Sequence, residues 1–113
     1  MLKRREEMER VERPNFKGGA GAVLSGSWPV ELPAHVKLVN VNTLNPGDEI
    51  GYHVHQNETE IYYVLEGELE FNDNGQEKTA KKGDILFTGH NTGHSAVNKS
   101  DKPATIFAII IME

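Results

Sequence analysis

The sequence predicts an all-β protein, with its strands closed into a barrel or stacked as a sandwich. Short runs of β-branched and aromatic residues recur along the chain, and turn-forming residues separate them. No stretch shows convincing helical periodicity. The length of 113 residues and the hydrophobic content of 37% allow one domain with a modest core.

The first 26 residues differ in composition from the rest. Residues 2–13 are rich in charge and are compatible with a short helix or an extended arm, which Pro14 ends. Residues 17–26 hold four of the eleven glycines, which suits a flexible connection or a strand that another backbone approaches closely. We therefore divide the chain into an N-terminal arm, residues 1–26, that can pack on a partner subunit, and a barrel domain, residues 27–113.

From residue 36 onward, the pattern is one of successive strands. We expect strands over residues 36–44, 52–55, 60–65, 68–72, 77–80, 85–87, 94–97 and 104–112. Asp73-Asn74-Gly75 predicts a tight hairpin, because Asn-Gly supplies the positive φ angles of a type I′ turn. We expect Phe71, Phe87 and Phe107 in the core, although the same residue type also lines substrate pockets.

The charge distribution limits the partners that the chain can bind. The net charge of −5 argues against nucleic acid, and no apolar run reaches the roughly 20 residues of a membrane-spanning helix. The chain has no cysteine and its N-terminus lacks the apolar stretch of a secretory signal, which favours a cytoplasmic protein. All four arginines precede Pro14, and residues 18–113 carry a net charge of −7. We therefore expect a mildly negative barrel mouth that favours neutral or singly charged substrates. The alternatives are an anion held with the help of Lys37, and an N-terminal arginine of the same or a partner chain that reaches the site.

Three histidines and one glutamate are the candidate metal ligands. Residues i and i+2 of a strand face the same way, so His53 and His55 point together. A short loop then brings Glu60 beside them, and His94 arrives from a different strand. This donor set suits manganese, iron, cobalt, nickel, copper or zinc. A lone His-x-His is also common without a metal, so the spacing by itself leaves the metal site open.

The same residues resemble the two signatures of the cupin superfamily. Residues 47–67 read G(x5)HxH(x4)E(x6)G, which matches the first signature at each defined position. The residues that fit the second signature, G(x5)PxG(x2)H(x3)N, are Gly83, His94 and Asn98. Gly89 and Asn91 stand in place of its proline and its inner glycine. The spacer, residues 68–82, has the length found in small single-domain microbial cupins, and residues 18–21 are loosely similar to the oxalate-decarboxylase-like group.

The resemblance implies a jelly-roll β-barrel that binds one divalent transition metal through His53, His55, Glu60 and His94. It also implies a small chelating ligand or substrate, and a metal-dependent enzyme of dioxygenase, isomerase or decarboxylase type. The alternatives are a non-catalytic module that binds or senses a small molecule, and a metal-free structural barrel. Tyr62 faces inward by parity and is the candidate catalytic residue, while Tyr62 and Phe107 are the candidate substrate contacts.

The remaining expectations concern the surface. His90 lies in a loop four residues before His94, and we expect it in solvent rather than on the metal. We expect His35 and Trp28 at the surface or at an interface. A homodimer is expected, because small barrels expose sheet edges that are safer covered and twofold dimers are the commonest oligomers.

Overall fold

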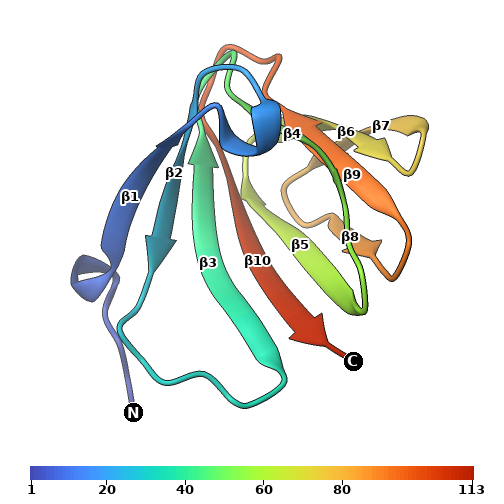
Figure 1. Cartoon of the computed structure of the whole chain (residues 1–113). Helices are drawn as coiled ribbons and strands as arrows, with labels where there is room; N and C mark the ends of the chain where they lie inside the picture. Colours follow the sequence, from blue (N-terminus) through green and yellow to red (C-terminus); the bar gives the residue numbers. More distant parts are fainter.

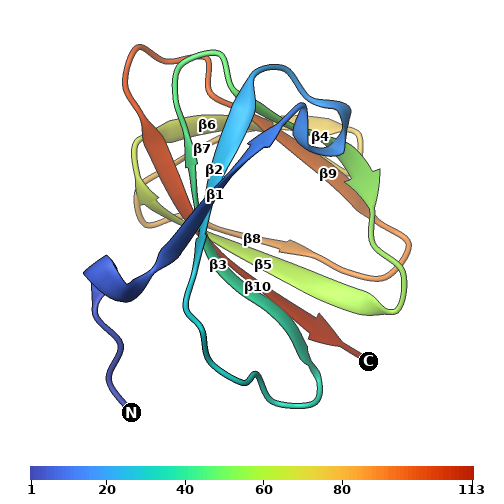
Figure 2. The same ribbon diagram turned by 60° about the vertical axis from the view of Figure 1, so that its left-hand side comes forward.

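The computed structural model describes residues 1–113 as ten strands in two antiparallel sheets (Figure 1). The larger sheet is, in order, β1 (Glu9–Pro14), β2 (Ala22–Ser27), β3 (Val36–Leu44), β10 (Ala104–Met112), β5 (Glu58–Glu66) and β8 (Ile85–Thr88). The smaller sheet is β4 (Glu49–Val54), β9 (Gly93–Val97), β6 (Glu68–Asp73) and β7 (Gln76–Lys81). The two sheets face each other across the core (Figure 2). The chain is therefore all-β with jelly-roll architecture, as expected.

Every strand expected from residue 36 onward is present, with ends that differ by a few residues. The turn between β6 and β7 has positive φ at both Asn74 (50°) and Gly75 (97°), which confirms the hairpin. The only helical segments are two single turns, η1 (Arg5–Glu7) and η2 (Phe16–Gly18). No helix in the structure is long and apolar enough to cross a membrane.

The N-terminal residues extend the chain's own larger sheet. β1 and β2 form an antiparallel hairpin, and β2 pairs with β3 over Leu24, Ser25 and Gly26. Val23 of β2 is fully buried in the core. Within residues 17–26, the structure therefore shows a strand from Ala22 onward, preceded by the end of η2 and a short connection.

Two glycines let the segment around η2 press against β4. A side chain on Gly19 would overlap the backbone carbonyl of Glu49, and one on Gly51 would overlap the carbonyl of Lys17. The backbone N–H of Glu49 also donates to the carbonyl of Ala20, at 2.9 Å. The N-terminal segment is thus held directly against the strand that carries His53.

Strand alternation decides which apolar residues enter the core. On β10 the buried residues are Ala104, Ile106, Ala108 and Ile110, so Phe107 lies on the outer face of the sheet. Phe71 is buried as expected, whereas the expectations for Phe87 and Phe107 are wrong, because Phe87 is 61% exposed and Phe107 is on the outward-facing side of β10. The four-residue edge strand β8 turns Thr88 inward and leaves Phe87 outside.

The outer side of the larger sheet carries an apolar patch. We call it the outer apolar face, and it comprises Tyr63, Leu65, Ile85, Phe87 and Ile111 from β5, β8 and β10, all of them exposed. Tyr63 pairs directly with Ile85 across β5 and β8. Contiguous exposed apolar residues of this kind mark interaction surfaces more often than isolated ones do.

Candidate metal centre

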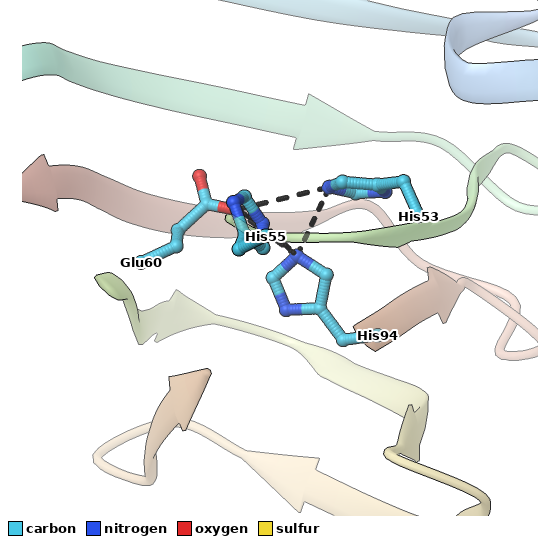
Figure 3. Close-up of side chains that lie close together, drawn as sticks. All are labelled: His53, His55, Glu60 and His94. Carbon is cyan, nitrogen blue, oxygen red and sulfur yellow. Dashed lines mark hydrogen bonds and ion pairs between the residues drawn. The ribbon is translucent and has the colours of Figure 1, made fainter. Parts of the chain in front are cut away.

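The two sheets bring the four candidate ligands to one point (Figure 3). His53 lies near the end of β4 and pairs directly with His94 of β9, so these two imidazoles are neighbours in the smaller sheet. His55 follows the end of β4 and turns inward like His53, while Val54 between them is exposed. Glu60 enters from β5 in the facing larger sheet. The facing expected from strand parity is therefore confirmed for His53, His55 and Glu60, and His94 comes from a different strand, as expected.

The donor atoms are spaced as the ligands of one metal ion would be. His94 Nε2 lies 3.1 Å from His53 Nε2 and 3.1 Å from His55 Nε2. Glu60 Oε1 lies 3.0 Å from His94 Nε2, 3.1 Å from His55 Nε2 and 4.0 Å from His53 Nε2. Two donors at right angles about a metal, each about 2.1 Å from it, stand about 3.0 Å apart. The residues present thus fit one divalent ion.

Burial and hydrogen bonding set the protonation of the cluster. Burial alone raises the pKa of Glu60, but hydrogen bonds from His55 and His94 outweigh it and lower the pKa to about 2. The hydrogen bond with Glu60 raises the pKa of His55, against the opposing effect of burial. Burial lowers the pKa of His53 below its ordinary value. The metal-free site therefore holds the ionised carboxylate of Glu60 close to the imidazoles. A bound cation would balance the negative charge of this carboxylate.

Each histidine ring is also held from behind, at its second nitrogen. His53 Nδ1 lies 2.7 Å from the Gly51 carbonyl, His55 Nδ1 lies 2.6 Å from Glu58 Oε2, and His94 Nδ1 lies 2.8 Å from Thr88 Oγ1. A carbonyl or a carboxylate can only accept, so Nδ1 of His53 and His55 must carry the proton. Nε2 is then the ring nitrogen that faces the cluster, and in its unprotonated form it can bind a metal in place of its contact with Glu60. The sequence analysis did not identify Glu58 or Thr88, although Glu58 shares a strand face with Glu60.

Tyr62 packs against the site, and Phe107 does not. The Tyr62 ring stacks on His94 with centroids 4.8 Å apart and an interplanar angle of 6°. Burial raises the pKa of Tyr62 well above its ordinary value, and the charge of Glu60 acts in the same direction. The phenol can donate a hydrogen bond but is not a base near neutral pH. Phe107, the other candidate substrate contact, faces away from the barrel interior.

A cavity of about 390 Å³ opens beside the ligands. Besides His53, His55 and Glu60, its wall includes Lys17, Lys37, Asn40, Asn42 and Tyr62. The wall therefore includes Lys37, the cation that the sequence offers as a partner for an anion, and Lys17 as well. Lys17 escaped the sequence analysis because it precedes the presumed barrel. The side-chain oxygen of Asn42 is buried without a hydrogen-bond partner, which suits contact with a ligand or a water molecule.

The other polar candidates lie apart from the metal ligands. His90 is exposed and accepts a hydrogen bond from the backbone of Asn57 at 2.8 Å, so it remains outside the cluster as expected. Trp28 donates from its indole nitrogen to the carbonyl of Arg4 at 2.9 Å. His35 is exposed on the loop before β3.

The jelly roll and its three-histidine, one-glutamate centre define the class of this protein. Residues 40–110 match the cupin domain, and the chain belongs to the cupin family. The chain is 35% identical to the oxalate-binding protein of Thermotoga maritima, over 99% of this chain and 94% of the relative.

Solved structures of cupins superpose well on this chain. A predicted oxalate decarboxylase from Thermotoga maritima is 33% identical, with a TM-score of 0.93 and full coverage of both chains. A cupin-superfamily sugar phosphate isomerase from Silicibacter pomeroyi has a TM-score of 0.78 at 22% identity, covering 100% of this chain and 76% of that one. The second similarity supports the fold alone.

Proposed function

We propose that this protein binds a small oxygen-donor chelator, such as a short carboxylate, at a divalent metal ion. The observation that carries the proposal is the convergence of His53, His55, Glu60 and His94 beside an open cavity. A six-coordinate ion with four protein ligands keeps two positions for a bidentate ligand. The Thermotoga maritima relative is named for oxalate binding, which supports a carboxylate in this role.

The charges at the cavity wall bear on the ligand. The sequence alone favours neutral or singly charged molecules, because residues 18–113 are acidic and have no arginine. Lys17 and Lys37 both lie at the cavity and are solvent-exposed. Lys37 is paired at 2.9 Å with Glu58 of the same wall, so Lys17 is the cation that changes this balance. Cations at an entrance raise the local concentration of anions. Singly charged carboxylates and compact dicarboxylates therefore both belong to the proposed ligand class.

Catalysis is the second candidate, favoured by a metal site with open positions next to Tyr62. A bound metal would supply Lewis-acid or redox chemistry to the ligand. Tyr62 would keep its proton and donate a hydrogen bond to a ligand oxygen, because its raised pKa prevents it from acting as a base. The two carboxylates at the wall, Glu58 and Glu60, are both engaged by His55, so we place ligand binding ahead of turnover.

Metal analysis and ligand titration test the proposal. The protein is purified without a histidine tag, loaded in turn with each candidate ion, and titrated calorimetrically with oxalate and glycolate. We expect one ion per chain, and ligand binding only in the loaded protein. Oxygen uptake and carbon dioxide release, measured on the same samples, separate turnover from binding. A wild-type protein that takes up no metal, or binds oxalate equally well without it, would refute the proposal.

The matched control uses two histidines that lie four residues apart. His94→Ala removes a buried ligand, while His90→Ala removes an exposed imidazole outside the cluster. We expect the first variant to lose metal and oxalate together and the second to retain both. Equal behaviour of the two variants would place the metal elsewhere.

We further propose that two copies of the chain pair through the outer apolar face. This face joins three neighbouring strands and includes the exposed edge strand β8. Removing its apolar side chains from water stabilises the dimer by about 25 cal/mol for each Å² of apolar surface buried. A twofold dimer covers the same patch on both copies and closes the assembly.

A further inference from the structure

A second carboxylate stands directly behind one of the metal ligands. Glu58 Oε2 lies 2.6 Å from His55 Nδ1, and Glu58 Oε1 lies 2.9 Å from Lys37 Nζ. The Glu58 side chain is only 11% exposed, whereas that of Lys37 is 54% exposed. A continuous line of contacts therefore runs from the solvent, through Lys37 and Glu58, to Nδ1 of His55, the ring nitrogen opposite the one that faces the metal site.

Local backbone geometry explains how Glu58 reaches this place. β5 begins at Glu58 and alternates, so Glu58, Glu60 and Tyr62 all face inward. Between β4 and β5 the chain reverses over three residues, His55, Gln56 and Asn57, with Asn57 in the left-handed region at φ 57°. This reversal brings His55 and Glu58, three residues apart, into contact. One strand thus supplies a metal ligand and the residue that supports a second ligand.

The three histidines differ in the group that lies within hydrogen-bond distance of Nδ1. His53 donates to a neutral backbone carbonyl, and His94 lies against a neutral hydroxyl. Only the Nδ1 atom of His55 faces a carboxylate, that of Glu58. A charged acceptor forms a shorter and stronger hydrogen bond than a neutral one, and it raises the basicity of the opposite ring nitrogen. His55 is therefore the ligand whose orientation and donor strength depend most on a neighbouring side chain.

We propose that Glu58 is a positioning residue for the metal centre. It fixes the Nδ1 proton of His55 and thereby aims Nε2 at the ion, and Lys37 steadies Glu58 from the solvent side. This inference rests on the proposed metal site but not on the identity of the ligand. The expected consequence is a centre whose metal affinity falls when Glu58 is changed, although Glu58 itself does not bind the ion.

The test compares Glu58→Ala and Glu58→Gln with Glu66→Gln. Glu66 lies on the same strand and pairs with Lys82 at 3.2 Å, so its variant removes an equal charge from an ion pair that is distant from the centre. Affinity for Co²⁺ is measured by competition with a coloured chelator, and the visible spectrum of bound Co²⁺ reports on its ligands. Melting of the metal-free variants shows whether each one is folded.

We expect Glu58→Ala to lower the affinity for Co²⁺ by roughly 10- to 100-fold. Glu58→Gln should lose less, because its amide oxygen still accepts the Nδ1 proton. Both changes should shift the Co²⁺ spectrum, and Glu66→Gln should leave affinity and spectrum unchanged. If Glu58→Ala does not fold, the glutamine variant alone decides. Wild-type affinity within twofold and an unchanged spectrum in the folded Glu58 variants would overturn this inference alone, whereas a wild-type protein without metal affinity would overturn the proposed function as well.

Discussion

Removal of the metal should lower the melting temperature of this protein without unfolding it at room temperature. The core is a cluster of eleven buried residues that contains none of the four ligands, so the barrel has its own source of stability. A free metal concentration of 100 times the dissociation constant stabilises the folded state by about 2.7 kcal/mol. At about 2.1 cal/mol/K per residue, a chain of 113 residues has an unfolding entropy of about 0.24 kcal/mol/K. The expected shift in melting temperature is therefore about 11 °C.

Calorimetry and circular dichroism check this expectation. The protein is melted after chelation and again at increasing free metal, where each tenfold rise in concentration should add about 1.4 kcal/mol. The β-sheet spectrum should survive chelation at room temperature. His94→Ala should lose the shift, and His90→Ala should keep it. Complete unfolding on chelation would show that the core cannot sustain the fold, and identical melting with and without metal would show that the cluster binds none.

Four further outcomes follow from particular contacts. Lys17→Met should weaken oxalate binding about tenfold, through loss of a cation at the cavity wall, and leave binding of neutral catechol unchanged in calorimetric titrations. Gly51→Ala should cost about 2 kcal/mol or more in urea unfolding, because its methyl group overlaps a backbone carbonyl, and a wild-type midpoint would contradict this. Phe87→Glu should yield monomers by light scattering from a dimeric wild type, and a wild type that is already monomeric would refute the dimer. In the metal-free protein, the pKa of Glu60 is 4.5 in the unfolded state and about 2 in the folded state, so the free energy of unfolding should fall as the pH drops from 4.5 to about 2. Urea unfolding at a series of pH values measures this loss, and Glu60→Gln should remove the part that is due to Glu60.

The strands after residue 36 and the metal ligands could be predicted because their signals are local. Alternation along one strand indicates that His53 and His55 face the same way, and the Asn-Gly pair predicts its own turn. The spacing of the cupin signatures supplies the long-range part of the site, which links Glu60 and His94 to the histidine pair. No element of that argument requires knowledge of which strands pair.

The rest depends on contacts between distant parts of the chain. The pairing of β2 with β3 places residues 22–27 in the larger sheet, and composition alone does not show this. Aromatic side chains are usually buried, which is why the sequence places Phe87 in the core. Successive residues of a strand face opposite sides, however, and on β8 Thr88 faces inward, so Phe87 faces outward. Thr88 acts behind His94, and that role becomes visible only once the orientation of the imidazole is known.

The close contact between the N-terminal segment and β4 also limits how this barrel can be cut or fused. Gly51 lies against the carbonyl of Lys17, and its own carbonyl receives the proton of His53 Nδ1. A cut at residue 26, the boundary that composition indicates, would therefore remove Lys17 and its contact with Gly51, the residue that holds the ring of His53. A fragment that starts there would lack Phe16 and Lys17, so water would replace one side of the cavity wall. A replacement N-terminus would need the right length and a glycine at position 19, where a side chain would overlap Glu49. We therefore expect residues 27–113 alone not to reproduce the metal-binding cluster of the whole chain.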